Sequence, residues 1–308
     1  MHQSVLLSET VQALKVQPQG IYVDATFGRG GHSRAILQQL GPKGRLIVFD
    51  QDPEAICYAQ EHFGEDARVQ IVASNFEHLA EHLDALQIPA VDGMLFDLGV
   101  SSPQLDAGER GFSFLKPGPL DMRMNPAMGL SCQELLLQID VNTLTRILKD
   151  YGEERFAGRI ARAVVARQTK APLTRTEELA ALIRDSIPKS LQEAHKHPAT
   201  RTFQALRIYL NRELEVLEQV LLTAPWRLKI GGRAVFISFH SLEDRLVKQA
   251  LQRLCQPRPV PRGLPIKTQA EDLPPFKLYI KMHKPDQAEI NNNVRARSAV
   301  MRAVERIR

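Results

Sequence analysis

Short apolar runs alternate with amphipathic stretches over the first hundred residues of the chain. The apolar runs, each predicted to form a buried strand, lie at 21–24, 46–50, 69–72 and 93–97. Helical patterns fall between them, at about 33–40, 52–62 and 77–86. Strands separated by single helices are typical of βαβ units, so this half predicts a parallel sheet covered on both faces.

The alternation stops between residues 105 and 201, where no buried strand is expected. A loop rich in Gly, Pro and Met (108–129) is followed by helical patterns at 132–149, 154–168 and 176–186. The sheet pattern then resumes, with a long helix at 202–222, a strand at 234–239, a helix at 241–254 and late strands at 276–281 and 298–304. We therefore predict an α/β fold with one doubly wound, mostly parallel, Rossmann-like sheet built from 1–104 and 202–308. An inserted helical domain, 105–201, interrupts it.

Composition narrows the class of protein. The 308 residues are 44% hydrophobic and 24% charged, as in ordinary globular proteins. No apolar run approaches the roughly 18 residues that a membrane span requires, and the first residues lack the pattern of a signal peptide. The three cysteines lie far apart without a Cys-x-x-Cys pair, which argues against a disulfide framework or a cysteine zinc site. We expect a cytoplasmic protein with no membrane partner and no metal.

Charge is unevenly distributed along the chain. Residues 1–144 contain 9 Lys/Arg and 18 Asp/Glu, whereas 145–212 contain 14 and 7, and 253–308 contain 12 and 5. A basic middle and tail suit a polyanion such as a nucleic acid. Basic helices that merely face solvent would give the same counts, so charge alone leaves both interpretations open.

The turn after the first predicted strand is typical of a nucleotide-type ligand site. It runs from Asp24 through Gly28, Gly30 and Gly31 to Ser33, and Asp50 ends the next strand, 20 residues after Gly30. Such glycines let a ligand approach the backbone, and such a carboxylate can accept ribose hydroxyls. A dinucleotide-binding dehydrogenase shares this layout, but its G-x-G-x-x-G pattern would need glycine at Ser33. Asp24 instead suits a ligand with a cationic end, such as S-adenosylmethionine.

The fourth predicted strand ends in a polar loop that runs from Asp97 to Gln104. An ordinary strand-to-loop exit would use the same turn residues. However, the carboxyl ends of parallel strands share one edge, so Asp24, Asp50 and Asp97 are expected around one pocket.

Motifs along nearly the whole chain carry a close resemblance. They are HQSVLL at 2–7, TFGRGGHS at 26–33, DLGVSSPQLD at 97–106, ERGFSF at 109–114, GPLDMRM at 118–124, YGEERF at 151–156, HPATRTFQA at 197–205 and SFHSLEDR at 238–245. With these motifs the chain resembles the bacterial ribosomal RNA small-subunit methyltransferase H family. One departure is Val294, where the family pattern has proline.

The resemblance implies an S-adenosylmethionine-dependent methyltransferase that modifies N4 of a cytidine in the 16S rRNA of the small ribosomal subunit. Its cofactor contacts then fall on Gly30, Gly31, His32, Asp50, Phe76, Asp97 and Gln104. The insertion becomes the substrate-recognition domain. The oligomeric state, monomer or homodimer, stays open.

Residue chemistry adds to this picture. Methylation at carbon 5 of cytosine would need a cysteine nucleophile. Cys57 and Cys255 are expected on helices, and Cys132 at the start of the insertion, away from the site. A nitrogen or oxygen target is therefore favoured. An exocyclic amine needs acceptors to orient it, and Asp97 is the candidate catalytic residue, although the resemblance also assigns it to the cofactor.

Several residues keep a second interpretation. Phe76 can stack on adenine or belong to the core, and His32 can contact the cofactor or only cap a helix. His240 can hold substrate or make a structural hydrogen bond.

Two larger alternatives remain at this point. The sequence HLAEH at 78–82 fits an H-x-x-E-H zinc pattern, but Leu79, Leu83 and Leu86 predict that its histidines face outward. A non-catalytic RNA-binding protein with an inactive nucleotide fold is the rival function, and retention of all three aspartates argues against it.

Overall fold

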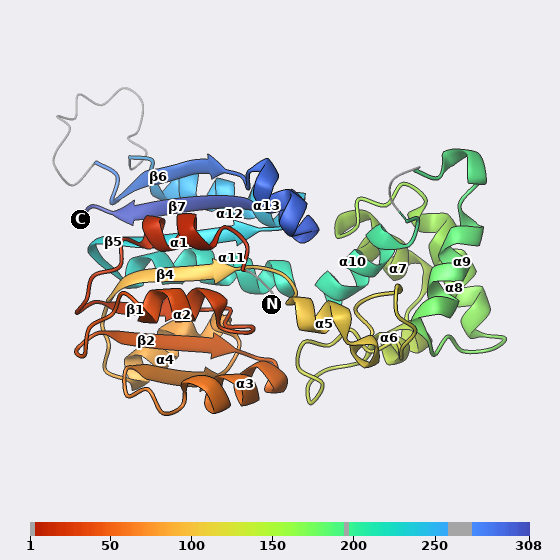
Figure 1. The fold of residues 1–308 in the computed structure, drawn as a ribbon. Coiled ribbons are helices and arrows are strands. Elements are labelled where there is room, and N and C mark those ends of the chain that lie inside the picture. The colour runs from red at the N-terminus through yellow and green to blue at the C-terminus, as the bar shows by residue number, and fades with distance from the viewer. Residues whose placement is uncertain (1–3, 194–196, 258–272) are drawn as a thin grey trace, which may run out of the picture. The chain divides into compact units, whose positions relative to one another are not determined.

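The computed structural model describes residues 4–193, 197–257 and 273–308. These residues form two compact units, one of residues 1–99 and 214–308 and the other of residues 100–213 (Figure 1). Residues 100–104 and 202–213 therefore group with the helical unit, so the insertion extends beyond the predicted 105–201 at both ends. No helix among the described residues is long and apolar enough to cross a membrane.

Unit 1 contains a seven-stranded sheet in the order β3-β2-β1-β4-β5-β7-β6. The strands are β1 (Ile21–Asp24), β2 (Arg45–Asp50), β3 (Val69–Ala73), β4 (Val91–Asp97), β5 (Leu228–Ser238), β6 (Phe276–His283) and β7 (Val300–Arg306). The first five are parallel, while β7 pairs antiparallel with both β5 and β6. This confirms the predicted doubly wound, mostly parallel sheet.

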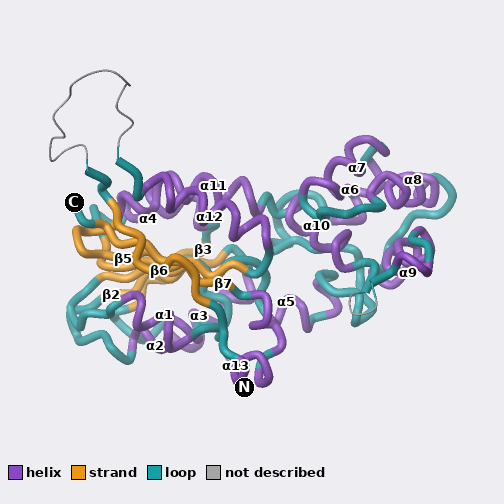
Figure 2. Tube along the Cα trace, turned by 90° about the horizontal axis from the view of Figure 1, so that it is seen from above, coloured by secondary structure: helices purple, strands orange, loops and turns teal. Residues whose placement is uncertain are grey.

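Helices cover both faces of this sheet, as Figure 2 shows. On one side lie α1 (Leu7–Leu14), α2 (Gly31–Leu37), α3 (Pro53–Phe63) and α13 (Gln287–Asn292), and on the other α4 (Leu79–Ala85), α11 (Glu213–Thr223) and α12 (Ser241–Leu254). Two separate buried clusters fill the two interfaces. The strand order reverses between β1 and β4, and in such sheets ligands bind at this switch point, beyond the carboxyl ends of the strands.

Unit 2 is helical and has its own buried core. Its helices are α5 (Ser102–Asp106), α6 (Cys132–Gln138), α7 (Val141–Asp150), α8 (Ala157–Gln168), α9 (Thr176–Ser186) and α10 (Thr200–Leu210). Short 3-10 helices are η2 (Gly108–Arg110) and η3 (Lys189–Leu191) here, and η1 (Phe76–His78), η4 (Ala224–Arg227) and η6 (Val294–Ser298) in unit 1.

Two long predicted helices are each broken in the structure. The pattern at 132–149 divides into α6 and α7 because Asp140 accepts hydrogen bonds from the N–H groups of Asn142 and Thr143 and so starts a new helix. The pattern at 202–222 divides into α10 and α11 at Arg212, whose φ of 51° is left-handed. Helices α1 and α13 were not predicted.

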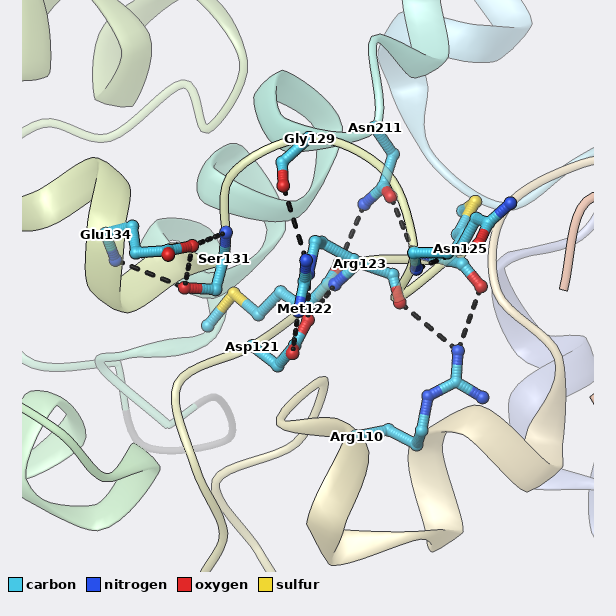
Figure 3. Close-up of polar contacts among 11 residues, drawn as sticks. Arg110, Asp121, Met122, Arg123, Asn125, Gly129, Ser131, Glu134 and Asn211 are labelled. Carbon is cyan, nitrogen blue, oxygen red and sulfur yellow. Dashed lines mark hydrogen bonds and ion pairs between the residues drawn. The ribbon is translucent and has the colours of Figure 1, made fainter. Parts of the chain in front are cut away.

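The segment 120–125 of unit 2 is fixed by the half-buried side chain of Asn211 and the buried side chain of Arg110 (Figure 3). Asn211 accepts from Met124 N at 2.7 Å and donates to Met122 O at 2.8 Å. The buried guanidinium of Arg110 donates to the carbonyls of Met124 (2.9 Å) and Arg123 (3.2 Å). These contacts satisfy the backbone of a stretch without regular structure. The Gly/Pro/Met-rich loop is therefore ordered here by polar side chains.

Candidate active site

Three aspartates end three neighbouring strands of unit 1. Asp24 is the last residue of β1, Asp50 of β2 and Asp97 of β4, and these strands are adjacent in the order β2-β1-β4. The structure thus places these sequence-predicted residues along one edge of the sheet, at the switch point. Parallel pairing alone produces this arrangement.

The turn from β1 to α2 is shaped by glycines. Gly28 and Gly30 have φ angles of 55° and 68°, a left-handed conformation in which a side chain is strained. At Gly30 a Cβ would also come within 2.7 Å of the rings of Phe27 and Phe63. Gly30 immediately precedes α2, so the backbone N–H groups at the start of that helix face the turn.

Asp24 is a buried carboxylate that is stabilised by a hydrogen bond from Ser33. Ser33, which replaces the third glycine of the dinucleotide pattern, donates its hydroxyl to Asp24 Oδ2 at 2.6 Å. Thr26 N donates to Oδ1 at 3.2 Å. Burial nevertheless raises the pKa of Asp24 to about 6, because the hydrogen bonds offset only part of the desolvation.

Asp50 connects the glycine turn to the next helix. Its Oδ2 accepts from Gly28 N at 2.8 Å and its Oδ1 from Asp52 N at 2.9 Å. Burial raises its pKa to about 6, and the charges of Asp52 and Asp24 add to this. Each oxygen retains a second lone pair, so the carboxylate can still accept from hydroxyl groups of a ligand.

Asp97 is the least compensated of the three carboxylates. Its main-chain N–H donates to Thr26 Oγ1 at 2.7 Å, which fixes the residue. Its Oδ1 is buried and has no hydrogen-bond partner among the residues that the structure describes. Burial raises the pKa of Asp97 well above its usual value, and the charges of Asp24 and Glu243 raise it further. An unpaired buried acceptor of this kind calls for a cation or a donor.

His32 lies beside Asp97. The imidazole is buried, with Nε2 3.1 Å from Val5 O and Nδ1 3.7 Å from Asp97 Oδ2. Burial lowers the pKa of His32 to about 4. Gly31 packs against the N-terminal segment, since a Cβ there would lie 2.0 Å from Ser4 Oγ. Residues 2–3 of the HQSVLL motif lie outside the described residues.

Phe76 and Gln104 complete the predicted set. Phe76 follows β3, is half-buried and packs edge-on against Phe96, with ring centroids 5.8 Å apart. Gln104 belongs to unit 2, where its Oε1 accepts from Ser101 N at 2.8 Å at the start of α5. Phe76 thus keeps an exposed part, while Gln104 has a local capping role.

Sequence reasoning missed a polar cluster after β5. Glu243 is buried and accepts from Phe239 N at 2.8 Å and His240 N at 3.2 Å, and His240 caps α12. Buried Ser238 Oγ has no hydrogen-bond partner in the described part of the chain. The SFHSLEDR motif at 238–245 contains these residues, but only His240 was a candidate from the sequence. The capping role supports the structural interpretation of His240.

The cysteines and the HLAEH segment lie on helices or at helix ends. Cys57 is on α3, Cys132 opens α6 and Cys255 immediately follows α12. Burial raises the pKa of the Cys132 thiol strongly and that of Cys255 less. In and just after HLAEH, Leu79 and Leu83 are buried, and Leu86 packs against the same core.

The predicted outward orientation of the HLAEH histidines holds for only one of them. His78 is exposed, next to Glu81 at 3.2 Å. His82, however, is only half-exposed and packs edge-on against Phe49, with ring centroids 5.6 Å apart.

Comparison with known proteins identifies the family. The model of the MraW methylase family matches residues 1–307. The chain belongs to this family. A protein of Idiomarina loihiensis named Ribosomal RNA small subunit methyltransferase H is 52% identical to this methylase over 310 residues, with 100% of this chain and 97% of that protein covered. A protein of the same name from Thioalkalivibrio sulfidiphilus is 50% identical, with 99% and 97% covered. A solved rRNA methylase structure from Streptococcus thermophilus covers 100% of this chain and 99% of its own, at 12% identity and a TM-score of 0.40.

The strand-end aspartates fit the methyl donor of this methylase, S-adenosylmethionine. That cofactor carries a sulfonium and an ammonium and has no pyrophosphate. The carboxylates of buried Asp24 and of half-buried Asp50 and Asp97, one of them with an unpaired buried oxygen, favour cations and would repel a pyrophosphate. The arrangement therefore disfavours the dinucleotide alternative on physical grounds.

Replacement of Asp50 by alanine tests the ribose contact. Asp50→Ala should weaken S-adenosylmethionine binding by about 1.5–3 kcal/mol, the scale of hydrogen bonds lost to a charged group. That is a roughly 10- to 150-fold higher Kd by isothermal titration calorimetry. Glu61→Ala, an exposed change on α3, is the matched control and should leave the Kd unaltered. An unchanged Kd for folded Asp50→Ala would remove Asp50 from the site.

Replacement of Asp97 by asparagine tests the uncompensated charge. The pKa of Asp97 is raised in the folded protein, so folding favours its protonated form, and stability falls as pH rises through that range. Asp97→Asn removes the charge. Without cofactor, the variant should therefore melt above the wild type at pH 8, and the gain should shrink at pH 5. Asp66→Asn is a control with the opposite expected sign. Arg68 lowers the pKa of Asp66, so the Asp66→Asn variant should melt below the wild type at pH 8. A gain for Asp97→Asn that does not depend on pH would contradict the assignment.

Proposed function

We propose that this chain transfers the methyl group of S-adenosylmethionine to N4 of a cytidine in the 16S rRNA of the small ribosomal subunit. We place the reaction in the cytoplasm. Unit 1 holds the cofactor through Gly30, Gly31, His32, Asp50, Phe76 and Asp97. The resemblance to the family adds Gln104 to this set. The observation that carries the proposal is the buried, unpaired Oδ1 of Asp97 at the switch point of a methylase sheet.

The bound cofactor supplies an electrophilic methyl group on a sulfonium. The task of the protein is therefore to align the acceptor and keep water out. Asp50 accepts from the ribose hydroxyls, and Asp24 and Asp97 provide negative charge near the cationic centres. The half-buried ring of Phe76 offers a face for adenine.

An exocyclic amine needs an acceptor because its lone pair is delocalised into the ring. We propose that Asp97 Oδ1 accepts a hydrogen bond from the amine N–H, orients the nitrogen lone pair in this way and then receives the proton. The target base must also leave its helix to reach such a pocket, at a cost of a few kcal/mol. No covalent enzyme intermediate is required.

Unit 2 is proposed as the rRNA-recognition domain. Its longest helix, α8, exposes Arg159 and Arg162, and Arg155 is exposed just before it. The helical pattern predicted at 154–168 includes all three basic positions. The helix in fact begins at Ala157, so Arg155 lies outside it, where its guanidinium stacks on Phe156.

Charge reversal on this surface tests the recognition role. Changing Arg155, Arg159 and Arg162 to glutamate should weaken rRNA binding and reduce the slope of log K against log salt by about 2–3, one unit or slightly less per lost phosphate contact. The Kd of S-adenosylmethionine should stay constant. Arg45→Glu, at the exposed start of β2, is the control. An unaltered salt slope in the triple variant would show that this surface only faces solvent.

The reaction itself is tested by labelled methyl transfer onto small subunits that lack the modification, followed by nucleoside analysis. We expect N4-methylcytidine. Asp97→Ala should nearly abolish turnover, whereas Cys57→Ala, Cys132→Ala and Cys255→Ala should each retain most of it, since free cysteines usually act as small hydrophobic residues. Detection of 5-methylcytidine, or an essential cysteine in a folded variant, would overturn the mechanism.

A further inference from the structure

The N-terminal segment Ser4–Leu6 is fixed against the start of α2. Val5 O contacts His32 Nε2 at 3.1 Å, and Leu6 N donates to Glu289 Oε1 on α13 at 2.7 Å. Leu6 is fully buried with a left-handed φ of 52°, a strained conformation that needs support from its surroundings. The carbonyl of Val5 is thus held in a defined position beside His32.

This carbonyl fixes the tautomer of His32. A carbonyl oxygen can only accept a hydrogen bond, so Nε2 must carry the hydrogen. The pKa of His32 is lowered to about 4 by burial, so the ring is neutral at pH 7. Its Nδ1 is therefore unprotonated, and this lone pair faces Asp97 Oδ2 at 3.7 Å.

Asp97 consequently has two different oxygens. Asp97 Oδ2 faces His32 Nδ1, and both atoms are acceptors. Their contact is favourable only when Oδ2 carries a proton that it can donate to Nδ1. Oδ1 is unpaired among the described residues. The other charged groups that act on Asp97 are the carboxylates of Asp24 and Glu243, and both favour its protonated form.

We propose that His32 is a positioning residue for the methyl transfer, whose unprotonated Nδ1 accepts a hydrogen bond from Asp97 once Asp97 has taken the proton lost by the acceptor amine. This inference rests on the proposed function. The Val5 carbonyl, held by the N-terminal segment, keeps the imidazole in the tautomer that this role requires.

The atoms and charges balance in this step. The amine nitrogen bonds to the methyl carbon as the carbon–sulfur bond breaks, and that electron pair stays on sulfur. An amine N–H bond then breaks, and an O–H bond forms on Asp97 Oδ1. Rotation of the carboxyl group about its Cβ–Cγ bond turns this O–H toward His32 Nδ1. The pocket loses the positive charge of the sulfonium and the negative charge of Asp97 together. His32 stabilises the protonated carboxyl that remains.

Two conservative variants separate this role from a purely structural one. In His32→Asn the side-chain oxygen branches from Cγ as Nδ1 does, so an acceptor facing Asp97 is retained while the Val5 contact is lost. In His32→Gln the amide reaches the position of Nε2, so the Val5 contact is retained. We expect His32→Gln to lower kcat by about 100-fold, the low end of the effect of a positioned proton-transfer group. His32→Asn should keep kcat at least about tenfold higher than that of His32→Gln.

The KM and Kd values show whether the loss of kcat reflects weaker binding or slower chemistry. With kcat measured at saturating cofactor, the KM for small subunits should stay constant. Because His32 is also a proposed cofactor contact, the Kd of S-adenosylmethionine should rise by a similar factor in both variants, and by much less than kcat falls in His32→Gln. If the Kd rises as much as kcat falls, or if His32→Gln is the more active variant, His32 acts only as a cofactor contact or a structural residue, and the inference is overturned.

The tautomer can be tested without any variant activity. Histidine-selective ¹⁵N NMR of the wild-type protein at pH 7 should show His32 with Nε2 protonated and Nδ1 unprotonated, with the ring signals assigned through the backbone resonances of the wild-type protein. A ring protonated at Nδ1 would refute the inference even if the variants fail to fold. The proposed function fails separately, if wild-type protein that binds S-adenosylmethionine places no methyl group on N4 of cytidine.

Discussion

The site depends on ionisable carboxylates that the fold desolvates. Asp24, Asp50 and Asp97 follow apolar strands, and the sheet that buries those strands also desolvates the carboxyl groups at their ends. Hydrogen bonds offset part of this cost at Asp24 and Asp50, but Asp97 Oδ1 has no such partner in the described structure. A cationic ligand would remove the remaining cost, so the least favourable feature of the free protein favours a sulfonium over an anionic nucleotide.

The sheet could be predicted because each of its strands is encoded by a short, continuous stretch of sequence. Each parallel strand is a short apolar run, and alternation with helices fixes the parallel class. The helix breaks were harder because helical periodicity continues across them. Asp140 was a visible cap signal that the periodicity outweighed. Asn211 was not a visible signal, because it holds Met122 and Met124, which lie almost ninety residues earlier in the chain.

The same distinction applies to the site. Parallel topology was sufficient to bring three strand-end aspartates to one edge, and glycine spacing was sufficient to place the turn. In the sequence, Ser33 was informative only because it replaces the third glycine of the dinucleotide pattern. Its hydrogen bond to Asp24 became visible only in the structure. The contacts of Val5 with His32 and of Leu6 with Glu289 join residues 27 and 283 positions apart. Neither periodicity nor a short motif encodes such pairs.

Burial also gives a reason for the timing of proton transfer under the proposed mechanism. While a sulfonium is near Asp97, the positive charge favours the carboxylate and opposes its protonation. Methyl transfer eliminates that charge, and the low-dielectric surroundings, with Asp24 and Glu243 nearby, then make Asp97 a stronger base. The carboxylate thus gains proton affinity at the step in which the methylated amine must lose a proton. A partner with a permanent positive charge in the place of His32 would suppress this change, whereas a neutral imidazole with a free lone pair preserves it.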